Sequence, residues 1–338
     1  MKAIAYTQHG LPIEDPRSLF DLDLPEPTPG PRDLLVAVKA ISINPVDTKV
    51  RARAESAEPK VLGWDVAGEV VAVGAAVTLF KPGDAVFYAG SITRPGCYSE
   101  LHVVDERIVG HKPASLDFAH AAALPLTSIT AWELLFDRLG VPENGGEEEA
   151  LLIVGAGGGV GSILTQLARR LTHLTVIGTA SRPETQQWVA DLGAHHVIDH
   201  SRPFAAQLSD LGISEVTHVA SLTHTDSYYT QLVDILAPQG HLGLIDDPAS
   251  LDALPLKAKS LALHWELMFT RSKYETADMI NQHLSLERVA ALIDQGVLKT
   301  TLGQHFGQIT AANIRRAHAL IESGKSRGKV VLEGFPAQ

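Results

Sequence analysis

A glycine-rich segment near the middle of the chain has the composition of a phosphate-binding turn. The apolar run 151–154 leads into five glycines within seven residues, from Gly155 to Gly161, and residues 160–171 then repeat apolar side chains at helical spacing. A strand, a turn and a helix in this order let the backbone approach a pyrophosphate, because the first N–H groups of a helix lack intrahelical partners. The alternative is a turn that only packs a helix close to a strand. The candidate phosphate-binding residues are Gly155, Gly158, Gly159, Val160 and Gly161.

The segment after the second expected strand of this unit indicates which dinucleotide binds. An NAD-preferring fold places a carboxylate there for the ribose 2′-hydroxyl, about 20 residues past the glycines, but residues 178–183 contain none. Ser181 could donate a hydrogen bond and Arg182 could pair with a 2′-phosphate in a forked geometry. We therefore expect NADPH. The alternative is that Arg182 is a solvated surface residue.

Other residues could complete a cofactor site at the carboxyl ends of the strands, where ligands of such parallel sheets bind. Leu222 and Thr223 end the fourth expected strand, and Ile245 ends the fifth. His200 follows the third strand and could touch the same phosphate as Arg182. Lys329, beside the closing strand, could also reach a cofactor phosphate, although surface lysines usually have no specific partner.

Composition and charge narrow the class of protein. A length of 338 residues suggests about two domains. The formal net charge of -11 argues against nucleic acid or an anionic membrane as a partner, because both attract basic patches. No apolar run reaches 18 residues, so we expect no membrane span and a cytoplasmic location. The single cysteine, Cys97, excludes an intrachain disulfide and a cysteine-based structural zinc site.

The pattern of strands and helices predicts a two-domain α/β protein. The first 125 or so residues contain short strands separated by Pro and Gly, as in a compact barrel-like β domain. The pattern turns helical at 119–136, and from Leu151 strands and helices alternate, which indicates a parallel, doubly wound sheet. After Met268 the pattern predicts helices at 277–283, 286–295 and 311–323, and then a last strand at 328–333. This C-terminal part is too short for a core of its own, so we expect it to return to the first domain.

Four sets of segments resemble the medium-chain dehydrogenase/reductase superfamily. They are residues 43–48, 62–74 with 80–86, 123–131, and 155–161 with 176–182 and 192–194. Their order and spacing cover nearly the whole chain and are most similar to the quinone oxidoreductase branch, in particular to the zinc-free group often labelled "zinc-type alcohol dehydrogenase-like". The resemblance implies a GroES-like β-barrel catalytic domain, 1–126 with 269–338, an inserted Rossmann domain, 127–268, and a homodimer built on the Rossmann-domain edge.

The metal ligands of zinc-using members of this superfamily are missing from the chain. Asn44 stands where those members carry a cysteine, and Gly63-Trp64-Asp65 stands where they carry Gly-His-Glu. A further cysteine is missing near Thr127, and so is the four-cysteine structural lobe. Catalytic zinc needs three protein ligands, so we expect no functional zinc, although the 15 histidines leave a scattered site conceivable.

Chemistry without a metal favours an electron-poor acceptor of hydride. Reduction of a ketone gains from a Lewis acid that stabilises the alkoxide, whereas a quinone or an α,β-unsaturated carbonyl spreads the charge onto an oxygen that hydrogen-bond donors can stabilise. The nicotinamide supplies the hydride and the protein supplies orientation. We therefore predict NADPH-dependent reduction of small-molecule quinones or enones.

The resemblance also suggests which residues lie near the substrate. Asn44 could hydrogen-bond substrate or cofactor, or it could simply form an Asn-Pro turn. Asp47 could orient that loop or a ribose hydroxyl, and Trp64 could wall the pocket or belong to the core. Thr127 lies at the domain junction, where the family holds the nicotinamide amide. Two alternatives remain: a zinc-dependent alcohol dehydrogenase, and an NADPH-binding sensor or structural protein with little turnover, since a fold does not dictate function.

Overall fold

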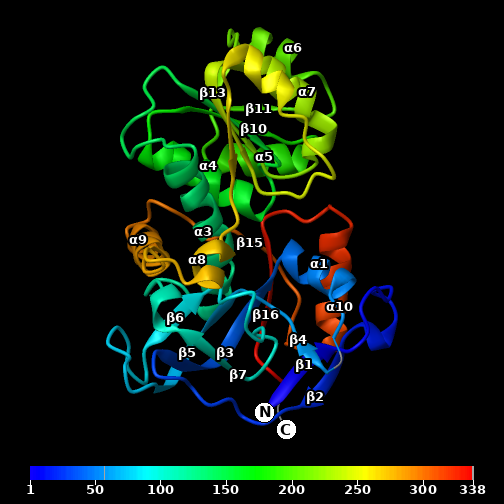
Figure 1. Cartoon of the computed structure of the whole chain (residues 1–338), viewed down its shortest axis with the longest axis vertical. Helices are drawn as coiled ribbons and strands as arrows, with labels where there is room; N and C mark the ends of the chain where they lie inside the picture. The colour runs from blue at the N-terminus through cyan, green and yellow to red at the C-terminus, as the bar shows by residue number, and fades with distance from the viewer. Residues whose placement is uncertain (57, 337–338) are drawn as a thin grey trace. The chain divides into compact units, whose positions relative to one another are not determined.

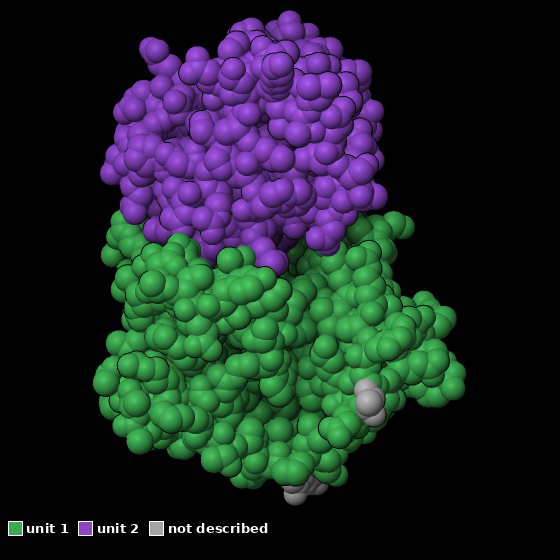
Figure 2. Space-filling model, in the orientation of Figure 1, with its two compact units in different colours: residues 1–129, 269–338 green, residues 130–268 purple. Residues whose placement is uncertain are grey.

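The computed structural model describes residues 1–56 and 58–336, and the chain divides into two compact units. Unit 1 comprises Met1–Ile129 and Phe269–Gln338, and unit 2 comprises Thr130–Met268 (Figure 2). The domain assignment drawn from the sequence, a catalytic domain at 1–126 with 269–338 and a dinucleotide-binding domain at 127–268, stays a prediction. No helix within the described ranges is long and apolar enough to cross a membrane.

Unit 1 is built on two β-sheets. A seven-stranded sheet has the order β15-β16-β3-β5-β6-β8, with β7 also paired to β3, and a three-stranded sheet has the order β2-β1-β4. The strands are β1 (Lys2–Tyr6), β2 (Phe20–Asp23), β3 (Asp33–Ile43), β4 (Lys60–Val61), β5 (Val66–Val73), β6 (Ala85–Tyr88), β7 (Leu101–Asp105), β8 (Val109–His111), β15 (Leu302–His305) and β16 (Lys329–Glu333).

The C-terminal strand β16 lies antiparallel to β3, with Val330 opposite Ile43 and Leu332 opposite Ile41. This pairing confirms that the last strand returns to the first part of the chain. Apolar residues drive it: Val330, Val331 and Leu332 are fully buried, as is Ile41. Burial at about 25 cal/mol per Å² of apolar surface makes such a strand a large contributor to the core of unit 1.

The helices of unit 1 differ in part from the sequence prediction. They are α1 (Pro45–Arg53), α2 (Phe118–Ala122), α8 (Phe269–Tyr274), α9 (Asn281–Asp294), α10 (Ala311–Glu322) and the first part of α3 (Pro125–Trp132), whose residues from Thr130 on belong to unit 2. The helical pattern expected at 119–136 is present but divided: α2 ends at Ala122 and α3 begins at Pro125, because residues that precede a proline tend to leave the helical conformation. In chain order α3 is followed by a π-helix, η3 (Glu133–Arg138), which belongs to unit 2.

Of the two helices expected at 277–283 and 286–295, the structure has only one over these described residues. Residues 277–280 form turns, and α9 begins at Asn281 and continues to Asp294 without a break. No Gly or Pro interrupts it, and its buried residues keep helical spacing, as Leu286, Val289 and Ile293 show. Helix α8 and strand β15 were not predicted. Helices α1 and α10, from distant parts of the chain, lie side by side (Figure 1).

Unit 2 is a doubly wound sheet of six parallel strands in the order β11-β10-β9-β12-β13-β14. This order, with the first strand in the middle, is that of a dinucleotide-binding fold, so the predicted fold class is confirmed. The strands are β9 (Ala150–Val154), β10 (Thr175–Thr179), β11 (His196–Ile198), β12 (Val216–Ser221), β13 (Leu236–Leu244) and β14 (Ala262–Trp265), and the helices are α4 (Gly159–Leu171), α5 (Pro183–Asp191), α6 (Phe204–Asp210) and α7 (Thr225–Ile235).

The core of unit 2 explains why the strands read as apolar runs. Leu152, Val219 and Leu242 are fully buried on neighbouring strands, and they pack against α6 and α7 through residues such as Phe204 and Leu232. Helix α4 packs against β9 and β10. Strands that are covered by helices carry no polar alternation, which is why the sequence pattern located them well.

Candidate functional site

The glycine turn joins β9 to α4 in unit 2 and has the geometry of a phosphate cradle. Gly155 adopts a φ of +82°, a left-handed conformation that side chains disfavour. A Cβ on Gly161 would lie 2.4 Å from the carbonyl oxygen of Gly155, so only glycine lets the helix start this close to the turn. The N-cap residue, Gly158, has no side chain to cap the first turn of α4. The N–H groups of that turn are therefore available to an anion.

Two threonines that the sequence analysis did not single out lie beside the turn. Thr179, the last residue of β10, accepts a hydrogen bond from the Gly155 N–H at 3.0 Å and thereby ties two strand ends together. The methyl group of Thr185 faces Gly157, where a Cβ would approach it to 2.1 Å. The hydroxyl of Thr185 is buried and has no hydrogen-bond partner among the described residues. An orphaned hydroxyl next to a glycine turn fits a bound phosphate group that would satisfy it.

The residues proposed for the 2′-phosphate follow the next two strands. Ser181 is exposed and Arg182 is the N-cap of α5, both just beyond the end of β10. The Arg182 guanidinium lies 3.5 Å from Glu184 Oε1, and its side chain is 41% exposed, so it can turn toward a phosphate. His200 follows β11, which pairs with β10. Partial burial lowers the pKa of His200, which favours the neutral ring.

The ends of β12 and β13 lie at the same edge of the sheet as the glycine turn. The methyl group of Thr223 would be 2.9 Å from a Cβ on Gly155, so Thr223 directly borders the turn. Leu222 precedes it, and its N–H donates to the carbonyl oxygen of Val154. The N–H of Ile245 donates to the carbonyl oxygen of Ser221, the last residue of β12. The structure therefore brings the proposed cofactor residues of unit 2 to one edge of its sheet.

The candidate catalytic residues of unit 1 centre on a buried polar cluster. Asn44, between β3 and α1, donates through its backbone N–H to Asp47 Oδ2 at 2.8 Å. Its side-chain Nδ2 donates to Asp65 Oδ2, also at 2.8 Å. Lys329, at the start of β16, donates to Asn44 Oδ1 and lies 3.0 Å from Asp65 Oδ2. These four residues and the carbonyl oxygen of Ile43, which Lys329 also contacts, form what we call the Asn44 cluster.

A chain of hydrogen bonds continues from this cluster into the core of unit 1. The Tyr98 hydroxyl donates to Asp47 Oδ2 at 2.8 Å and lies 3.1 Å from His318 Nε2. While Asp47 is ionised, the single hydroxyl proton goes to its carboxylate, so His318 Nε2 is then the donor to Tyr98. Burial raises the pKa of Asp47 to about 7 and lowers the pKa of His318 to about 3. The imidazole is therefore neutral at physiological pH.

The other two catalytic candidates make hydrogen bonds inside unit 1. Trp64 is 1% exposed, donates from Nε1 to the carbonyl oxygen of Ser91 at 3.1 Å, and packs edge-on against Phe269. Thr127 is buried and donates to the carbonyl oxygen of Leu124. Trp64 thus has the contacts of a core residue, and the Thr127 hydroxyl is used within its own helical turn.

The expectation that Lys329 reaches a cofactor phosphate needs correction. Lys329 is 3% exposed and not a surface lysine. Its ammonium has three donors, and they are directed to Ile43, Asn44 and Asp65. The physical reason is the neighbouring buried carboxylate, since an unpaired charge in the core is costly.

Sequence reasoning missed Asp65, Tyr98 and His318 as members of the cluster. Asp65 was noted only as part of a motif that lacks metal ligands, although a carboxylate within an apolar strand segment signals a buried partner. Tyr98 and His318 carried no such signal, because they are 220 positions apart and meet only through the packing of unit 1.

The donor set of the Asn44 cluster does not fit zinc. The oxygens that a cation would need already hold the Lys329 ammonium. Cys97 is nearby, but its Sγ is fully buried and directed at the carbonyl oxygen of Asp65, and burial raises the pKa of the thiol. Within the described part of the chain no group of three His, Cys, Asp or Glu residues could hold a metal ion. Tetrahedral zinc requires deprotonated sulfur, imidazole or carboxylate ligands.

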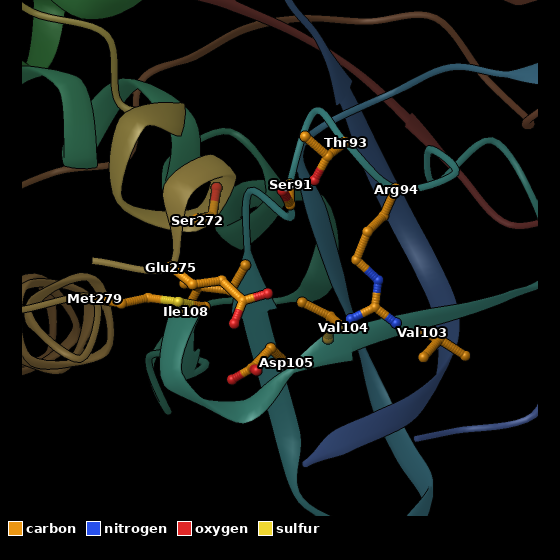
Figure 3. Close-up of a pocket in the computed structure, with 10 residues that line it drawn as sticks. All are labelled: Ser91, Thr93, Arg94, Val103, Val104, Asp105, Ile108, Ser272, Glu275 and Met279. Atoms are coloured by element: carbon orange, nitrogen blue, oxygen red, sulfur yellow. Dashed lines mark hydrogen bonds between the residues drawn. The ribbon is translucent and has the colours of Figure 1, made fainter. Parts of the chain in front are cut away.

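A separate cavity of about 120 Å³ lies elsewhere in unit 1. Figure 3 shows Ser91, Arg94, Asp105 and Glu275 among the residues around it. Two charged residues of its lining are already paired: Arg94 donates two hydrogen bonds to Asp33, and Asp105 accepts hydrogen bonds from Arg107. The cavity adjoins the Trp64 region through the Trp64–Ser91 hydrogen bond but shares no residue with the Asn44 cluster.

Comparisons with known proteins extend over both units. Residues 30–114 match the family described as alcohol dehydrogenase GroES-like domain, and residues 192–332 match the family described as zinc-binding dehydrogenase. A zinc-type alcohol dehydrogenase-like protein of Staphylococcus aureus is 41% identical over 312 residues, which make up 91% of this chain and 92% of that protein.

Two solved structures agree with the fold over almost the whole chain. A protein of Rhizobium etli CFN 42, provisionally assigned as a zinc-dependent alcohol dehydrogenase, is 55% identical with a TM-score of 0.95, and the match covers 100% of this chain and 99% of that one. The quinone oxidoreductase of Escherichia coli, solved in complex with NADPH, is 26% identical with a TM-score of 0.84, over 98% of this chain and 100% of that one. By sequence and by fold, the chain belongs to the medium-chain dehydrogenase/reductase superfamily of oxidoreductases, among the relatives of the quinone oxidoreductases.

Proposed function

We propose that the protein uses NADPH to reduce quinones or α,β-unsaturated carbonyls by hydride transfer, without a metal. The observation that carries the proposal is the phosphate cradle: an uncapped helix α4, a Gly161 that tolerates no Cβ, and the orphaned hydroxyl of Thr185 beside the turn. When bound, NADPH supplies the hydride. That the related quinone oxidoreductase of Escherichia coli was solved with NADPH supports this choice of cofactor.

The residues of unit 2 divide the task of holding the cofactor. The N–H groups at the start of α4 bind the pyrophosphate; the residues concerned are Gly155, Gly158, Gly159, Val160 and Gly161. Ser181 and Arg182 bind the 2′-phosphate, with His200 beside them. Leu222, Thr223 and Ile245 line the path of the cofactor beyond the strand ends.

The residues of unit 1 act on the substrate side. Asn44, Asp47, Trp64 and Thr127 shape that side through their buried hydrogen bonds. A metal-free reaction is supported by the chemistry of the donor set, because an amide, an indole and a hydroxyl stand where zinc-using relatives carry ligands. A quinone or enone suits such a site, since its developing oxyanion can be stabilised by hydrogen-bond donors alone.

The proposal extends to the cellular context. We propose a cytoplasmic homodimer that acts on a small molecule, with neither nucleic acid nor membrane as a partner. The formal net charge of -11 supports the last point, because polyanions would repel the protein.

The test is a steady-state assay with purified protein. NADPH oxidation is followed with phenanthrenequinone, with a series of enones, and with simple ketones and aldehydes, before and after treatment with EDTA. We expect turnover of the quinone and enones that EDTA leaves unchanged. Activity that EDTA abolishes and zinc restores would favour a zinc-dependent alcohol dehydrogenase instead. NADPH binding with no turnover of any acceptor would favour a sensor or structural role.

A further inference from the structure

We propose that Lys329 is a positioning residue whose ammonium, held by three oxygen atoms, fixes the orientation of the Asn44 side-chain amide. Its Nζ lies 3.0 Å from the carbonyl oxygen of Ile43 and 3.0 Å from Asp65 Oδ2, and it donates to Asn44 Oδ1. An ammonium carries three donors and no acceptor, so each N–H has one oxygen. Because Lys329 is only 3% exposed, water does not compete for these donors.

The register between β16 and β3 places the lysine where this is possible. Val330 lies opposite Ile43 in an antiparallel pair, so the residue before Val330 faces the residue after Ile43. The Ser42 hydroxyl donates to the carbonyl oxygen of Val330 at 3.0 Å and reinforces the register. A shift of one residue would point Lys329 away from Asn44. The contact between Lys329 and Asn44 therefore depends on the pairing of β16 with β3.

Two opposite charges hold the Asn44 amide from its two ends. The ammonium of Lys329 can only donate, so the amide oxygen must face it. The carboxylate of Asp65 can only accept while ionised, so the amide nitrogen must face that side, 2.8 Å away. An asparagine between neutral partners could turn over and exchange the two ends. Between these partners it cannot, because the flipped amide would lose two charge-assisted hydrogen bonds.

The same ammonium balances the buried negative charge of the cluster. Asp65 and Asp47 are both fully buried, and Lys329 favours the ionised form of each against desolvation and against their mutual repulsion. The other groups that act on them are neutral donors: the Asn44 amides, the Leu126 N–H on Asp65 and the Tyr98 hydroxyl on Asp47. Removal of the ammonium should therefore change the protonation of the cluster as well as its geometry.

The inference rests on the proposed function in one respect, that Asn44 lies on the substrate side of the reaction. A fixed amide there presents the same donors and acceptors to every substrate molecule. Preorganised dipoles of this kind need no reorganisation when charge develops. Lys329 thus acts on the reaction through Asn44 and touches neither substrate nor cofactor.

The experiment compares Lys329→Met with the double variant Lys329→Met/Asp65→Asn, and uses Lys325→Met as an exposed control. Lys329→Met keeps an unbranched side chain that is one atom shorter, but it leaves Asp65 without its paired cation. We expect kcat with the quinone to fall by about ten- to a hundred-fold, the factor for one hydrogen bond to a charged group, with little change in KM for NADPH. The double variant removes both charges and should recover the thermal stability of the wild type without recovering kcat. If the double variant recovers both the thermal stability and kcat of the wild type, the Lys329–Asp65 pair is only structural and the proposal is overturned. The proposal is overturned as well if neither Lys329→Met nor the double variant folds.

Two further measurements distinguish a loss of the Asn44 amide orientation from a general loss of structure in the variants. Lys329→Ala leaves room for an exogenous amine, so propylammonium should restore part of kcat whereas tetramethylammonium, which has no N–H donor, should not. Equal effects of the two cations would contradict the proposal that N–H donors to the three oxygen atoms fix Asn44. The side-chain amide of Asn44 in nitrogen-15-labelled protein should give two distinct, slowly exchanging proton signals that broaden in Lys329→Met. The second readout needs no turnover. If the wild type reduces no quinone or enone, the proposed function fails while the amide signals still decide whether Lys329 fixes Asn44.

Discussion

Lys329 Nζ lies 3.0 Å from Asp65 Oδ2, and both side chains are almost completely buried. The two residues are far apart in the chain, and the pairing of β16 with β3 is what brings Lys329 to this position. A buried ion pair adds little net stability compared with apolar residues, but the removal of one partner leaves a charge in the core without compensation. The stability of unit 1 should therefore depend strongly on keeping both partners of this pair.

The first prediction concerns that pair. Asp65→Asn should lower the free energy of unfolding by about 3 to 5 kcal/mol, because the buried Lys329 ammonium loses the carboxylate with which it is directly paired. Urea unfolding followed by fluorescence measures the change, with Asp15→Asn, in an exposed ion pair with Arg17, as control. If both variants unfold at the same urea concentration, the cluster does not carry the charge described here.

The second prediction concerns the choice of cofactor. Arg182→Ala should raise the KM for NADPH by about ten-fold or more and leave the KM for NADH nearly unchanged, because only NADPH carries the 2′-phosphate that the guanidinium would bind. Steady-state kinetics with both cofactors measure the ratio. The exposed Arg202, which follows β11, supplies the control variant Arg202→Ala. An equal loss with NADPH and NADH would contradict the assignment of Arg182.

The third prediction uses two glycines of the same turn. Gly161→Ala should weaken NADPH binding and lower the melting temperature, because its Cβ would lie 2.4 Å from the carbonyl oxygen of Gly155. Gly158→Ala should be tolerated, because its Cβ would be 3.4 Å from the same oxygen and its φ is -77°. Fluorescence titration with NADPH and thermal unfolding compare the two. Similar behaviour of both variants would show that the close approach of helix and turn does not matter for binding.

The fourth prediction concerns the pH dependence of stability in unit 2. Burial, together with the neighbouring Glu133, raises the pKa of Glu266, while Arg138 at 2.8 Å opposes the shift. The unfolded chain loses this proton at the ordinary carboxyl pKa, whereas the folded protein keeps it to higher pH. Between the two values the folded state binds more protons, so this group makes stability fall as pH rises.

Glu266→Gln removes this titration and should flatten the decline in stability between about pH 5 and about pH 8. Urea unfolding at both pH values measures the effect against the wild type. Glu26→Gln, at an exposed position of unit 1, is the matched control and should leave the slope unchanged. An unchanged slope in Glu266→Gln would show that Glu266 titrates alike in the folded and unfolded states.

The fold of unit 2 could be predicted from the sequence because its signals are local. Strand β9, the glycines and α4 follow one another directly, so apolar runs and glycine spacing reveal their structure. The same local signals placed Ser181 and Arg182 at the end of β10. Local patterns failed at helix boundaries that no Gly or Pro marks. Helix α9 continues through residues 284–285, where a gap between two helices was predicted.

The amino-acid sequence by itself determined the fold class, the family and the glycine turn, because residues close in the chain encode these through periodicity and motif spacing. Only the tertiary structure decided the role of Lys329, which was expected at a phosphate and instead holds Asn44 and Asp65. It also decided that Tyr98 links Asp47 to His318. The physical reason is that such contacts depend on strand register and helix packing across hundreds of residues. A buried charge must find its partner there, wherever in the chain that partner lies.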